Sequence, residues 1–458
     1  MIEDKFHDEC AVVGVVNVPE AAKYCYLGLY AMQHRGQEGA GIVSTNGKQV
    51  FAHRDTGLVA DVFSGEALTG LEGSLAIGHT RYATFGRKDK SNLQPLSANF
   101  LNSSFSIAHN GNLVNARSIR DRLEKEGSIF STTSDTETFL HLIAKAKDKQ
   151  SIVNRVIEAA RQVEGAYSLV VKSGQNLIAV RDPAGVRPLS LGKLGDGYMV
   201  ASETCAFDLV GAELVREIEP GEVLRITDSG ELESFRIDEN NKSRSALCIF
   251  EYVYFSRPDS VIDGKSVYAV RKQLGSELAG EHPVDADYVI PVPDSGVPAA
   301  LGFAQSSKIP LEFGLIRNHY VGRTFIEPQQ SIRDFGVKIK LNPNAKLLAG
   351  KKVVLVDDSL VRGTTSKKIV AMLRQAGVKE VHFRISSPPT ISPCHYGIDT
   401  PSKEELIASS NTTEEICKFI AADSLAYLSV EGMYRAVEHK RENYCDACFS
   451  ENYPCGVP

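Results

Sequence analysis

The sequence predicts an α/β protein built from two domains of unlike type. Its 458 residues exceed what one compact core usually holds, so two or three domains are expected. The first half reads as short strands interleaved with helical stretches around 116–126 and 135–147, followed by a β-rich run from 166 to 236. The second half alternates strand, loop and helix, which is typical of a mostly parallel sheet with helices on both faces.

The polar stretch 238–246 (DENNKSRSA) is the expected boundary between the two domains, because the pattern changes there. We therefore expect a first domain at 10–240 and a second domain at 241–458. Residues 1–9 are expected to be a propeptide, for the chemical reason given below.

Composition and charge exclude several classes of protein. Hydrophobic residues are 43% and charged residues 24% of the chain, which is ordinary for a soluble globular protein. No apolar run approaches the roughly 18 residues needed to span a bilayer, so no membrane insertion is expected. The net charge of −6 argues against binding nucleic acid by bulk electrostatics.

The compartment is predicted from the first residues and the cysteines. The stretch MIEDKFHDE has no apolar core of a signal peptide, so a cytoplasmic location is expected. In a reducing cytoplasm, nine cysteines are buried thiols, nucleophiles or metal ligands rather than a disulfide framework.

Cys10 opens the first predicted strand, at 10–16. A cysteine there is often only a small core residue. If residues 1–9 are removed, however, Cys10 becomes the first residue, and its own α-amine, with an ordinary pKa of about 7.7–8.0, can accept the thiol proton. Three histidines leave a Cys–His hydrolase open as an alternative, and they are His34, His79 and His109.

Four motifs follow Cys10 in order: QHRGQEGAG (33–41), GHTRYAT (78–84), HNGNL (109–113) and STTSDTE (131–137). Their order and wording resemble the N-terminal-nucleophile glutaminase domain of class II glutamine amidotransferases, an αββα sandwich. The resemblance implies that Cys10 is the nucleophile and that Arg81 holds the substrate carboxylate, with Thr84 nearby. It further implies an oxyanion hole from the Asn110 side chain and the Gly111 N–H, and an α-ammonium site at Asp135.

Each of these residues also has a purely structural interpretation. Asn110-Gly111 alone is a turn signal, and Arg81 alone is compatible with a surface charge. Ser134 to Glu137 reads as a helix capping box, in which Asp135 serves only the first turn of the helix.

A phosphate site is predicted in the second half, within VVLVDDSLVRGTTS. The strand Val353–Val356 delivers Asp357 and Asp358 to the carboxyl end of a parallel sheet, where open α/β sheets bind ligands. The loop that follows, just before a helix, offers Gly, hydroxyls and amides to a phosphate, and it consists of Arg362, Gly363, Thr364, Thr365 and Ser366. The two carboxylates suit vicinal sugar hydroxyls or hydrated Mg²⁺. The alternative is a capped helix start with a solvated acidic pair.

The same stretch resembles the phosphoribosylpyrophosphate (PRPP) motif of type I phosphoribosyltransferases. The resemblance implies that the acids hold the ribose hydroxyls, that the loop holds the 5′-phosphate, and that one Mg²⁺ per subunit lies by Ser295, Asp357 and Asp358. The expected pyrophosphate loop is Pro293, Asp294, Ser295 and Gly296. The segment 317–340 resembles a mobile lid with Arg323 and Lys338 available to PRPP, although it also reads as a long basic loop.

From Cys10 to about Tyr453 the chain resembles one family, the glutamine-dependent enzymes that aminate PRPP. The expected reaction converts PRPP, glutamine and water to 5-phosphoribosylamine, glutamate and pyrophosphate, the first step of de novo purine synthesis. The resemblance implies a homotetramer inhibited by purine nucleotides. Three alternatives stay open: another class II amidotransferase, a PRPP-sensing regulator without catalysis, and a glutaminase scaffold with a redox-sensing cluster.

The cysteines predict a metal site in the second half. Cys445 and Cys448 have the CxxC spacing of metal ligands, and zinc is a possible occupant from residue type. Cys248 and Cys394 fall where the iron–sulfur branch of this family has its ligands, which implies one structural 4Fe–4S cluster per subunit held by four thiolates. Cys455 has no predicted role.

Overall fold

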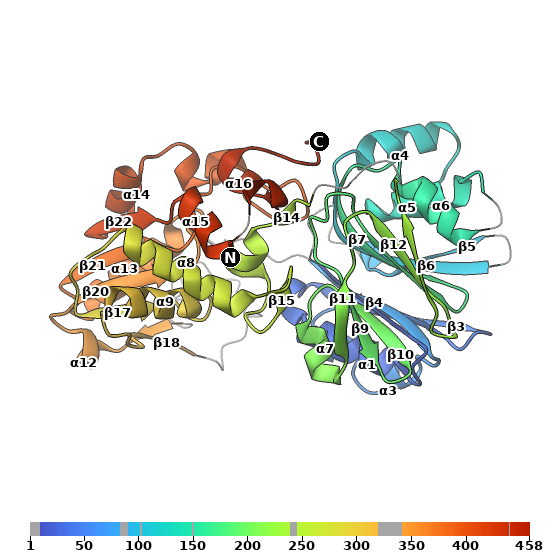
Figure 1. Cartoon of the computed structure of the whole chain (residues 1–458), viewed down its shortest axis with the longest axis horizontal. Coiled ribbons are helices and arrows are strands. Elements are labelled where there is room, and N and C mark those ends of the chain that lie inside the picture. Colours follow the sequence, from blue (N-terminus) through green and yellow to red (C-terminus); the bar gives the residue numbers. More distant parts are fainter. Residues whose placement is uncertain are drawn as a thin grey trace.

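The computed structural model describes residues 10–82, 90–100, 103–148, 151–238, 245–318, 341–438 and 440–458. Several predicted features lie outside these residues: the propeptide 1–9, Thr84, and Arg323 and Lys338 of the expected lid. In Figure 1 the first half of the chain, blue to green, lies on the right, and the second half, yellow to red, lies on the left.

The first half contains two antiparallel sheets. The seven-stranded sheet has the order β11-β9-β10-β1-β4-β2-β3. Its strands are β1 (Ala11–Val16), β2 (Gly39–Thr45), β3 (Val50–Thr56), β4 (Leu75–Arg81), β9 (Ser190–Leu194), β10 (Gly197–Ala201) and β11 (Glu213–Glu217). The six-stranded sheet has the order β13-β12-β8-β7-β6-β5. Its strands are β5 (Leu96–Phe100), β6 (Ser103–Leu113), β7 (Gly165–Ser173), β8 (Asn176–Arg181), β12 (Glu222–Ile226) and β13 (Leu232–Arg236).

The alternation of side chains along β1 explains why these sheets stack. Val12 and Val16 join a core that contains Val170 and Leu177 of the other sheet, whereas Val13 and its odd-numbered neighbours join a core with the helices on the outer face. Those helices are α1 (Ala21–Ala31) and α7 (Cys205–Val210). The second sheet is covered by α4 (Ala116–Lys125), α5 (Thr136–Lys145) and α6 (Ile152–Ala160). The result is the expected αββα sandwich.

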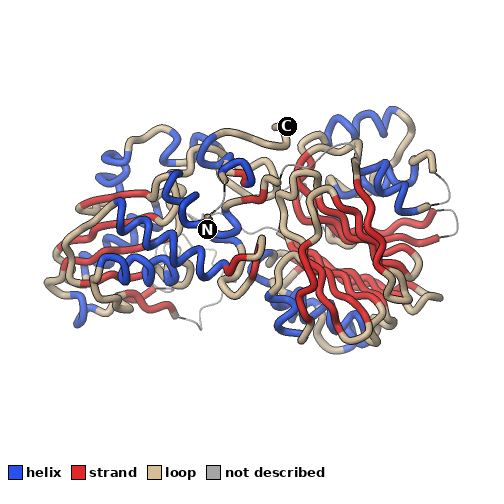
Figure 2. Tube along the Cα trace, in the orientation of Figure 1, coloured by secondary structure: helices blue, strands red, loops and turns tan. Residues whose placement is uncertain are grey.

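The second half is built on a four-stranded parallel sheet of order β17-β20-β21-β22. Its strands are β17 (Tyr288–Pro291), β20 (Lys352–Asp357), β21 (Glu380–Ile385) and β22 (Ser424–Tyr427). In β20, Val354 and Val356 face a core shared with α8 (Val267–Glu281), α9 (Val297–Ser307) and α15 (Val430–Val437). Val353 and Leu355 face α13 (Thr364–Gln375) and α14 (Thr413–Ile420). Helices therefore cover both faces of this sheet, as Figure 2 shows.

Short elements lie between and around these layers. A one-turn π-helix, η3 (Glu251–Phe255), follows β14 (Leu247–Cys248), which pairs in parallel with β23 (Tyr444–Cys445). The other short strands are β15 (Val261–Ile262), β16 (Lys265–Ser266), β18 (Leu315–Arg317) and β19 (Leu341–Pro343). The short helices are α2 (Val59–Val62), α3 (Glu66–Thr69), α12 (Ala345–Leu348), α16 (Ala447–Ser450), η1 (Gln33–Arg35), η2 (Lys90–Asn92), η4 (Lys403–Glu405), η5 (Ile407–Ser409) and η6 (Arg441–Asn443).

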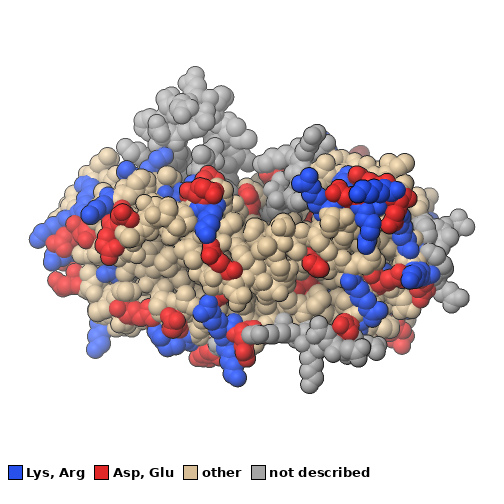
Figure 3. All heavy atoms as spheres, turned by 90° about the horizontal axis from the view of Figure 1, so that it is seen from above, with Lys and Arg blue, Asp and Glu red and all other residues tan. Residues whose placement is uncertain are grey.

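The surface carries both signs of charge. In Figure 3, basic and acidic side chains lie interspersed on the visible face rather than in one basic patch. In the described part of the chain, no helix reaches the length and apolarity that crossing a bilayer requires.

Candidate functional site

Cys10 lies immediately before β1, which runs through the seven-stranded sheet between β10 and β4. Ala11 pairs with Thr80 of β4, so Cys10 comes next to the end of that strand. The Cys10 thiol is buried and donates to the carbonyl oxygen of Tyr82 at 3.4 Å. The sheet therefore holds this thiol beside Arg81, the last residue of β4.

Arg81 is fixed by its backbone as well as by its strand. It pairs with Gly39 of β2, and its carbonyl accepts from the Glu38 N–H at 3.1 Å. The residue is buried, with 6% of its surface exposed, so the interpretation as a surface charge is wrong. A buried guanidinium close to a thiol can hold an anionic group of a small substrate there.

Asn110 and Gly111 lie within β6, in the second sheet, and β6 contacts both β1 and β4 across the sandwich. Asn110 is fully buried, and neither its amide nitrogen nor its amide oxygen has a hydrogen-bond partner among the described residues. Leaving a buried amide unsatisfied is costly, and such groups occur at functional sites. The two residues are in a strand, so the interpretation as a turn is wrong.

Gly111 has a conformation and a position that require glycine. Its φ is +139°, and a Cβ atom there would lie 2.0 Å from the carbonyl oxygen of Ala166. A backbone N–H at such a site can come close to a ligand atom that a side chain would exclude. Asn110 and Gly111 thus offer two donors of the kind an oxyanion hole uses.

Asp135 immediately precedes α5 but makes no side-chain capping bond to that helix. Its carboxylate accepts from the Leu113 N–H at 3.1 Å and lies 3.6 Å from Nδ1 of His109. Burial alone would raise the pKa of Asp135, but His109 and these hydrogen bonds bring it below the usual range. The alternative interpretation as a capping box is wrong, because the Glu137 carboxylate accepts from the backbone of Ser131 and Thr132 instead.

The three histidines named as possible partners of Cys10 have hydrogen-bond partners elsewhere. His34 lies 2.7 Å from a carboxylate oxygen of Glu203, His79 lies 3.1 Å from the carbonyl of His109, and His109 contacts Thr136 at 3.2 Å. Burial and the charge of Arg81 lower the pKa of His79 to about 3, so its ring is neutral at pH 7. These contacts favour the α-amine over a histidine as the base for Cys10.

The second candidate site lies at the carboxyl ends of β17 and β20, which are neighbours in the parallel sheet. Asp357 ends β20, and both Asp357 and Asp358 are buried, with 2% and 1% of their surface exposed. The Asp358 N–H donates to the Asp357 carboxylate at 2.9 Å, and the Ser359 hydroxyl donates to the Asp358 carboxylate at 2.7 Å. The acid pair is therefore not a solvated surface feature.

The loop from Arg362 to the start of α13 runs beside these acids. Gly363 has a φ of +76°, which turns the chain into the helix. Thr364, Thr365 and Ser366 form the first turn of α13, and the N-terminus of a helix favours an anion. Arg362 lies 3.2 Å from the Glu405 carboxylate, a contact that the sequence did not indicate.

The predicted pyrophosphate loop, Pro293 to Gly296, follows β17 and precedes α9. Gly296 packs against the end of β20: a Cβ atom there would lie 2.6 Å from the carbonyl oxygen of Val356. Asp294 forms an ion pair with Arg317. Adjacent parallel strands thus bring the loops at 293–296 and 357–366 to one edge of the sheet.

The four predicted cluster cysteines surround one small cavity. Cys248 of β14 pairs in register with Cys445 of β23, and Cys448 lies in α16. Cys394 comes from the loop after β21, and the rest of the lining consists of aromatic residues together with Ile398, Thr400 and Ala447. Burial and the neighbouring thiols raise the pKa of Cys448 well above its usual value. Within the described residues, no three His, Cys, Asp or Glu side chains are grouped to hold one metal ion.

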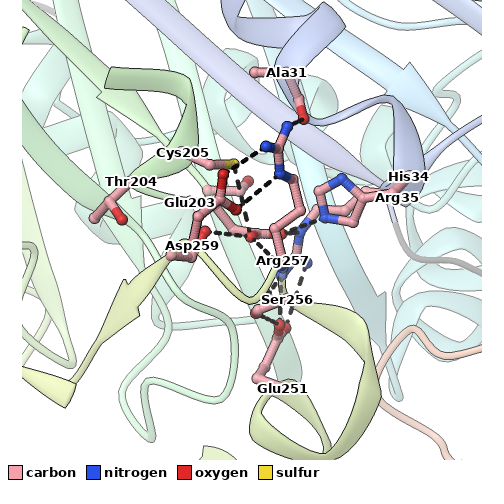
Figure 4. A network of polar contacts seen from close by, with 12 residues as sticks. Ala31, His34, Arg35, Glu203, Thr204, Cys205, Glu251, Ser256, Arg257 and Asp259 are labelled. Atoms are coloured by element: carbon pink, nitrogen blue, oxygen red, sulfur yellow. Dashed lines mark hydrogen bonds and ion pairs between the residues drawn. The ribbon is translucent and has the colours of Figure 1, made fainter. Parts of the chain in front are cut away.

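A buried ionic network between the two halves was not predicted. It joins Arg35 to Glu203 and Glu251, and Figure 4 shows these side chains together. One signal was available in the sequence, because Glu251 interrupts the apolar run CIFEYVYF. A charge inside such a run is expected to have a buried partner, but the run does not show which one.

The fold and the two sites define a class of protein, a glutamine amidotransferase domain joined to a phosphoribosyltransferase domain. Residues 79–208 match the glutamine amidotransferase domain model, and residues 264–386 match the phosphoribosyl transferase domain model. The chain belongs to the amidophosphoribosyltransferase family.

The relatives cover nearly the whole chain. It is 51% identical to the chloroplastic amidophosphoribosyltransferase of Glycine max, over 99% of this chain and 79% of the relative. It is 50% identical to the amidophosphoribosyltransferase of Bacillus subtilis, over 98% of this chain and 95% of the relative. The solved glutamine PRPP amidotransferase from B. subtilis, complexed with ADP and GMP, superposes with a TM-score of 0.93 at 49% identity and covers 98% of both chains.

Proposed function

We propose that this chain transfers ammonia from glutamine to PRPP, giving 5-phosphoribosylamine, glutamate and pyrophosphate, the first step of purine nucleotide synthesis. The observation that carries the proposal is the presence of two complementary sites in one chain. One has a buried thiol and an amide with no hydrogen-bond partner in the described part of the chain, and the other has a buried acid pair beside a phosphate-type loop. The names of the relatives support the same reaction.

In the first site, Cys10 acts as the nucleophile once residues 1–9 have been removed. Its α-amine takes the thiol proton, and the sulfur attacks the amide carbon of glutamine. Asn110 and the Gly111 N–H stabilise the oxyanion, the C–N bond breaks, and ammonia leaves. Water then hydrolyses the thioester to glutamate.

The glutamine itself is held by the charges around this thiol. Arg81 binds the α-carboxylate, with Thr84 nearby, and Asp135 binds the α-ammonium. The low pKa of Asp135 supports its role, since an ionised carboxylate is needed to bind an ammonium group at neutral pH.

In the second site, Asp357 and Asp358 bind the ribose hydroxyls of PRPP. The 5′-phosphate lies on the loop and first helical turn formed by Arg362, Gly363, Thr364, Thr365 and Ser366. Asp294, Ser295 and Gly296 hold the pyrophosphate, with Arg323 and Lys338 of the lid. Mg²⁺, held by Ser295, Asp357 and Asp358, would neutralise the leaving pyrophosphate. The lid excludes water, so that ammonia rather than water attacks the anomeric carbon.

We assign Cys248, Cys394, Cys445 and Cys448 to one structural 4Fe–4S cluster. Four thiols around one apolar cavity fit that group. Iron content of anaerobically purified protein tests the assignment. Cys445→Ser is expected to lose the iron, whereas the matched variant Cys455→Ser is expected to retain about four iron atoms per subunit. Equal iron in both variants would refute it.

We further propose that the chain is a cytoplasmic homotetramer inhibited by purine nucleotides, and that its two domains meet near residue 240. The ADP and GMP bound to the solved relative support nucleotide inhibition. The last strand of the sandwich ends at Arg236 and the next element begins at Leu247, which supports the boundary.

The decisive test is glutamate release from glutamine, with and without PRPP and Mg²⁺, on anaerobic protein whose N-terminal mass shows Cys10 as the first residue. We expect PRPP to increase the rate markedly. No increase, with the cluster intact, would refute the amidotransferase function and favour a PRPP-sensing regulator.

A further inference from the structure

Glu251 occupies an unusual position between the two halves. It opens the π-helical turn η3, and its side chain has no exposed surface. Its carboxylate accepts from both terminal nitrogens of Arg35, one of them at 3.3 Å, and lies 3.5 Å from the Arg187 guanidinium. Burial alone would raise the pKa of Glu251, but these two arginines bring it below the usual range, so the group is ionised.

The first arginine, Arg35, lies next to a residue that packs on Arg81, which is proposed to bind the carboxylate of glutamine. Its guanidinium also bonds Glu203, which anchors the loop after η3 by accepting from the Arg257 N–H at 2.9 Å. The next residue, Gly36, packs on the end of β4, where a Cβ atom would lie 2.8 Å from the backbone nitrogen of Arg81. A shift of Arg35 therefore presses directly on the backbone that carries Arg81.

The second arginine, Arg187, is hydrogen-bonded to a turn that contacts the candidate oxyanion hole. Its guanidinium donates twice to the Tyr396 carbonyl, at 2.9 and 2.6 Å. The neighbouring Gly397 packs on Gly111, with a hypothetical Cβ atom only 2.9 Å from the Gly111 backbone. The adjacent His395 carbonyl accepts from the Asn112 side chain at 2.9 Å. The turn held by Arg187 thus supports the strand that carries Asn110 and Gly111.

The other side of η3 leads toward the acid pair of the second site. Arg271 of α8 donates to the carbonyls of Tyr252 and Ser256, both at 2.7 Å, at the two ends of the turn. Burial lowers the pKa of Arg271 to about 10, opposed most strongly by the charge of Asp358. The turn is also packed against the second site, because Tyr252, Val253 and Phe255 share one hydrophobic core with Val356 and Val361, which lie on either side of the acid pair.

We propose that Glu251 is a positioning residue for glutamine hydrolysis, which holds Arg81 and the Asn110–Gly111 donors in register through Arg35 and Arg187 and links both to the PRPP site through the η3 turn. This inference rests on the proposed function. Its physical basis is that the buried carboxylate of Glu251, from the second half, contacts two buried guanidiniums from the first, those of Arg35 and Arg187. Breaking these buried ion pairs is costly, and the close packing around them leaves the side chains little freedom to rearrange.

Glu251→Gln tests the proposal because it keeps the size of the side chain and removes the charge. We expect stimulation of glutamine hydrolysis by PRPP to fall about tenfold, within the usual range of coupling between sites. The KM for glutamine is expected to rise more than kcat falls. The reaction with free ammonia uses only the second site, so its rate should stay within about twofold of the parent.

The matched control is Glu222→Gln. Glu222 is equally buried and is bonded to Arg216 and Ser234, but it lies in β12, away from this network. It should leave both the glutamine and the ammonia reactions unchanged. A Glu251→Gln protein with parental stimulation by PRPP, or one whose two reactions fall equally, would overturn the proposal.

Ser256→Ala covers the case in which Glu251→Gln fails to fold. The Ser256 hydroxyl donates to Glu251 and accepts from Arg35 at 3.1 Å, so its loss loosens the same contact without changing a charge. A smaller loss of stimulation with intact ammonia activity is expected, and unchanged stimulation would then refute the inference. If the parent itself shows neither PRPP-stimulated hydrolysis nor use of ammonia, the proposed function has failed rather than this inference.

Discussion

The two halves of the chain build their sites from different parts of a sheet. In the antiparallel sandwich, the candidate catalytic groups lie in or directly beside strands: Cys10 before β1, Arg81 at the end of β4, and Asn110 and Gly111 inside β6. In the parallel sheet, they lie in the loops after β17 and β20. Strand positions are held by ladder hydrogen bonds on both sides, whereas loop positions depend on turns and helix starts.

The polar groups of the two sites also differ in whether they already have hydrogen-bond partners. Asn110 is buried without a hydrogen-bond partner in the described structure, so the desolvation of its amide is not compensated before the substrate binds. Asp357 and Asp358 are equally buried, but they accept hydrogen bonds from their own backbone and from Ser359. Within the described residues, the amide of the sandwich site is thus left for a ligand to satisfy, whereas the acid pair of the parallel sheet already has protein donors.

The largest effect is expected from Cys10→Ala, which distinguishes the activity of the first half from that of the second. Glutamine-dependent synthesis should fall about 10⁴-fold or more, as for loss of other nucleophiles, while synthesis from free ammonia persists. Parallel assays with glutamine and with ammonium chloride measure both. If the two rates fell together, the thiol would be required for the structure of the whole protein rather than for glutamine hydrolysis alone.

Asp357→Asn is the counterpart in the second half. Removing this charge should lower synthesis from both glutamine and ammonia by about 10²-fold, because both reactions use the same PRPP site. Hydrolysis of glutamine without PRPP should continue at its basal rate. A loss confined to the glutamine reaction would contradict the division of roles.

Asn110→Ala sharpens the comparison of polar groups. The glutaminase kcat should fall about 10²- to 10³-fold, while the free energy of unfolding changes by less than about 1 kcal/mol, because the Asn110 amide has no hydrogen-bond partner among the residues that the structure describes. Asn92 is the matched control: it is equally buried but bonded to Thr133 at 2.8 and 2.9 Å. Asn92→Ala should cost about 1–3 kcal/mol and spare kcat. Denaturant unfolding and initial rates distinguish the two outcomes.

The last prediction concerns the pH dependence of folding stability and a histidine of the sandwich core, and it involves no change in catalysis. His79 has a pKa of about 3 in the folded protein, against an ordinary value of about 6.5 when unfolded. Because the unfolded chain binds the extra proton between these values, folding stability should decrease as the pH falls from 6.5 toward 3, by on the order of 4 kcal/mol from this group.

His79→Gln should flatten this part of the stability curve, whereas His53→Gln serves as a control for loss of a less buried histidine. Urea unfolding at pH 7, 6 and 5 measures the slope. Equal slopes for the parent and His79→Gln would show that other groups determine the acid sensitivity.

Much of the phosphate site could be predicted because its residues are close in sequence, whereas the residues from Cys10 to Asp135 were predicted by the resemblance of their motifs to a known family. Asp357 through Ser366 form one strand, one loop and one helix start, so the chemistry of the phosphate site is contained in ten consecutive residues. Local alternatives were harder to judge. The capping box at Ser134–Glu137 failed because the Glu137 carboxylate found backbone donors in the preceding loop, which spacing alone does not reveal.

The sequence alone determined the layers of this protein, because alternation along strands such as β1 and β20 selects which side chains face which core. It also determined the residue types at each site. Only the tertiary structure decided the partners of buried charges, such as Glu251 with Arg35, which is 216 residues away. Propensity and spacing act over a few residues, whereas the partner of a buried charge is chosen by the packing of the whole chain.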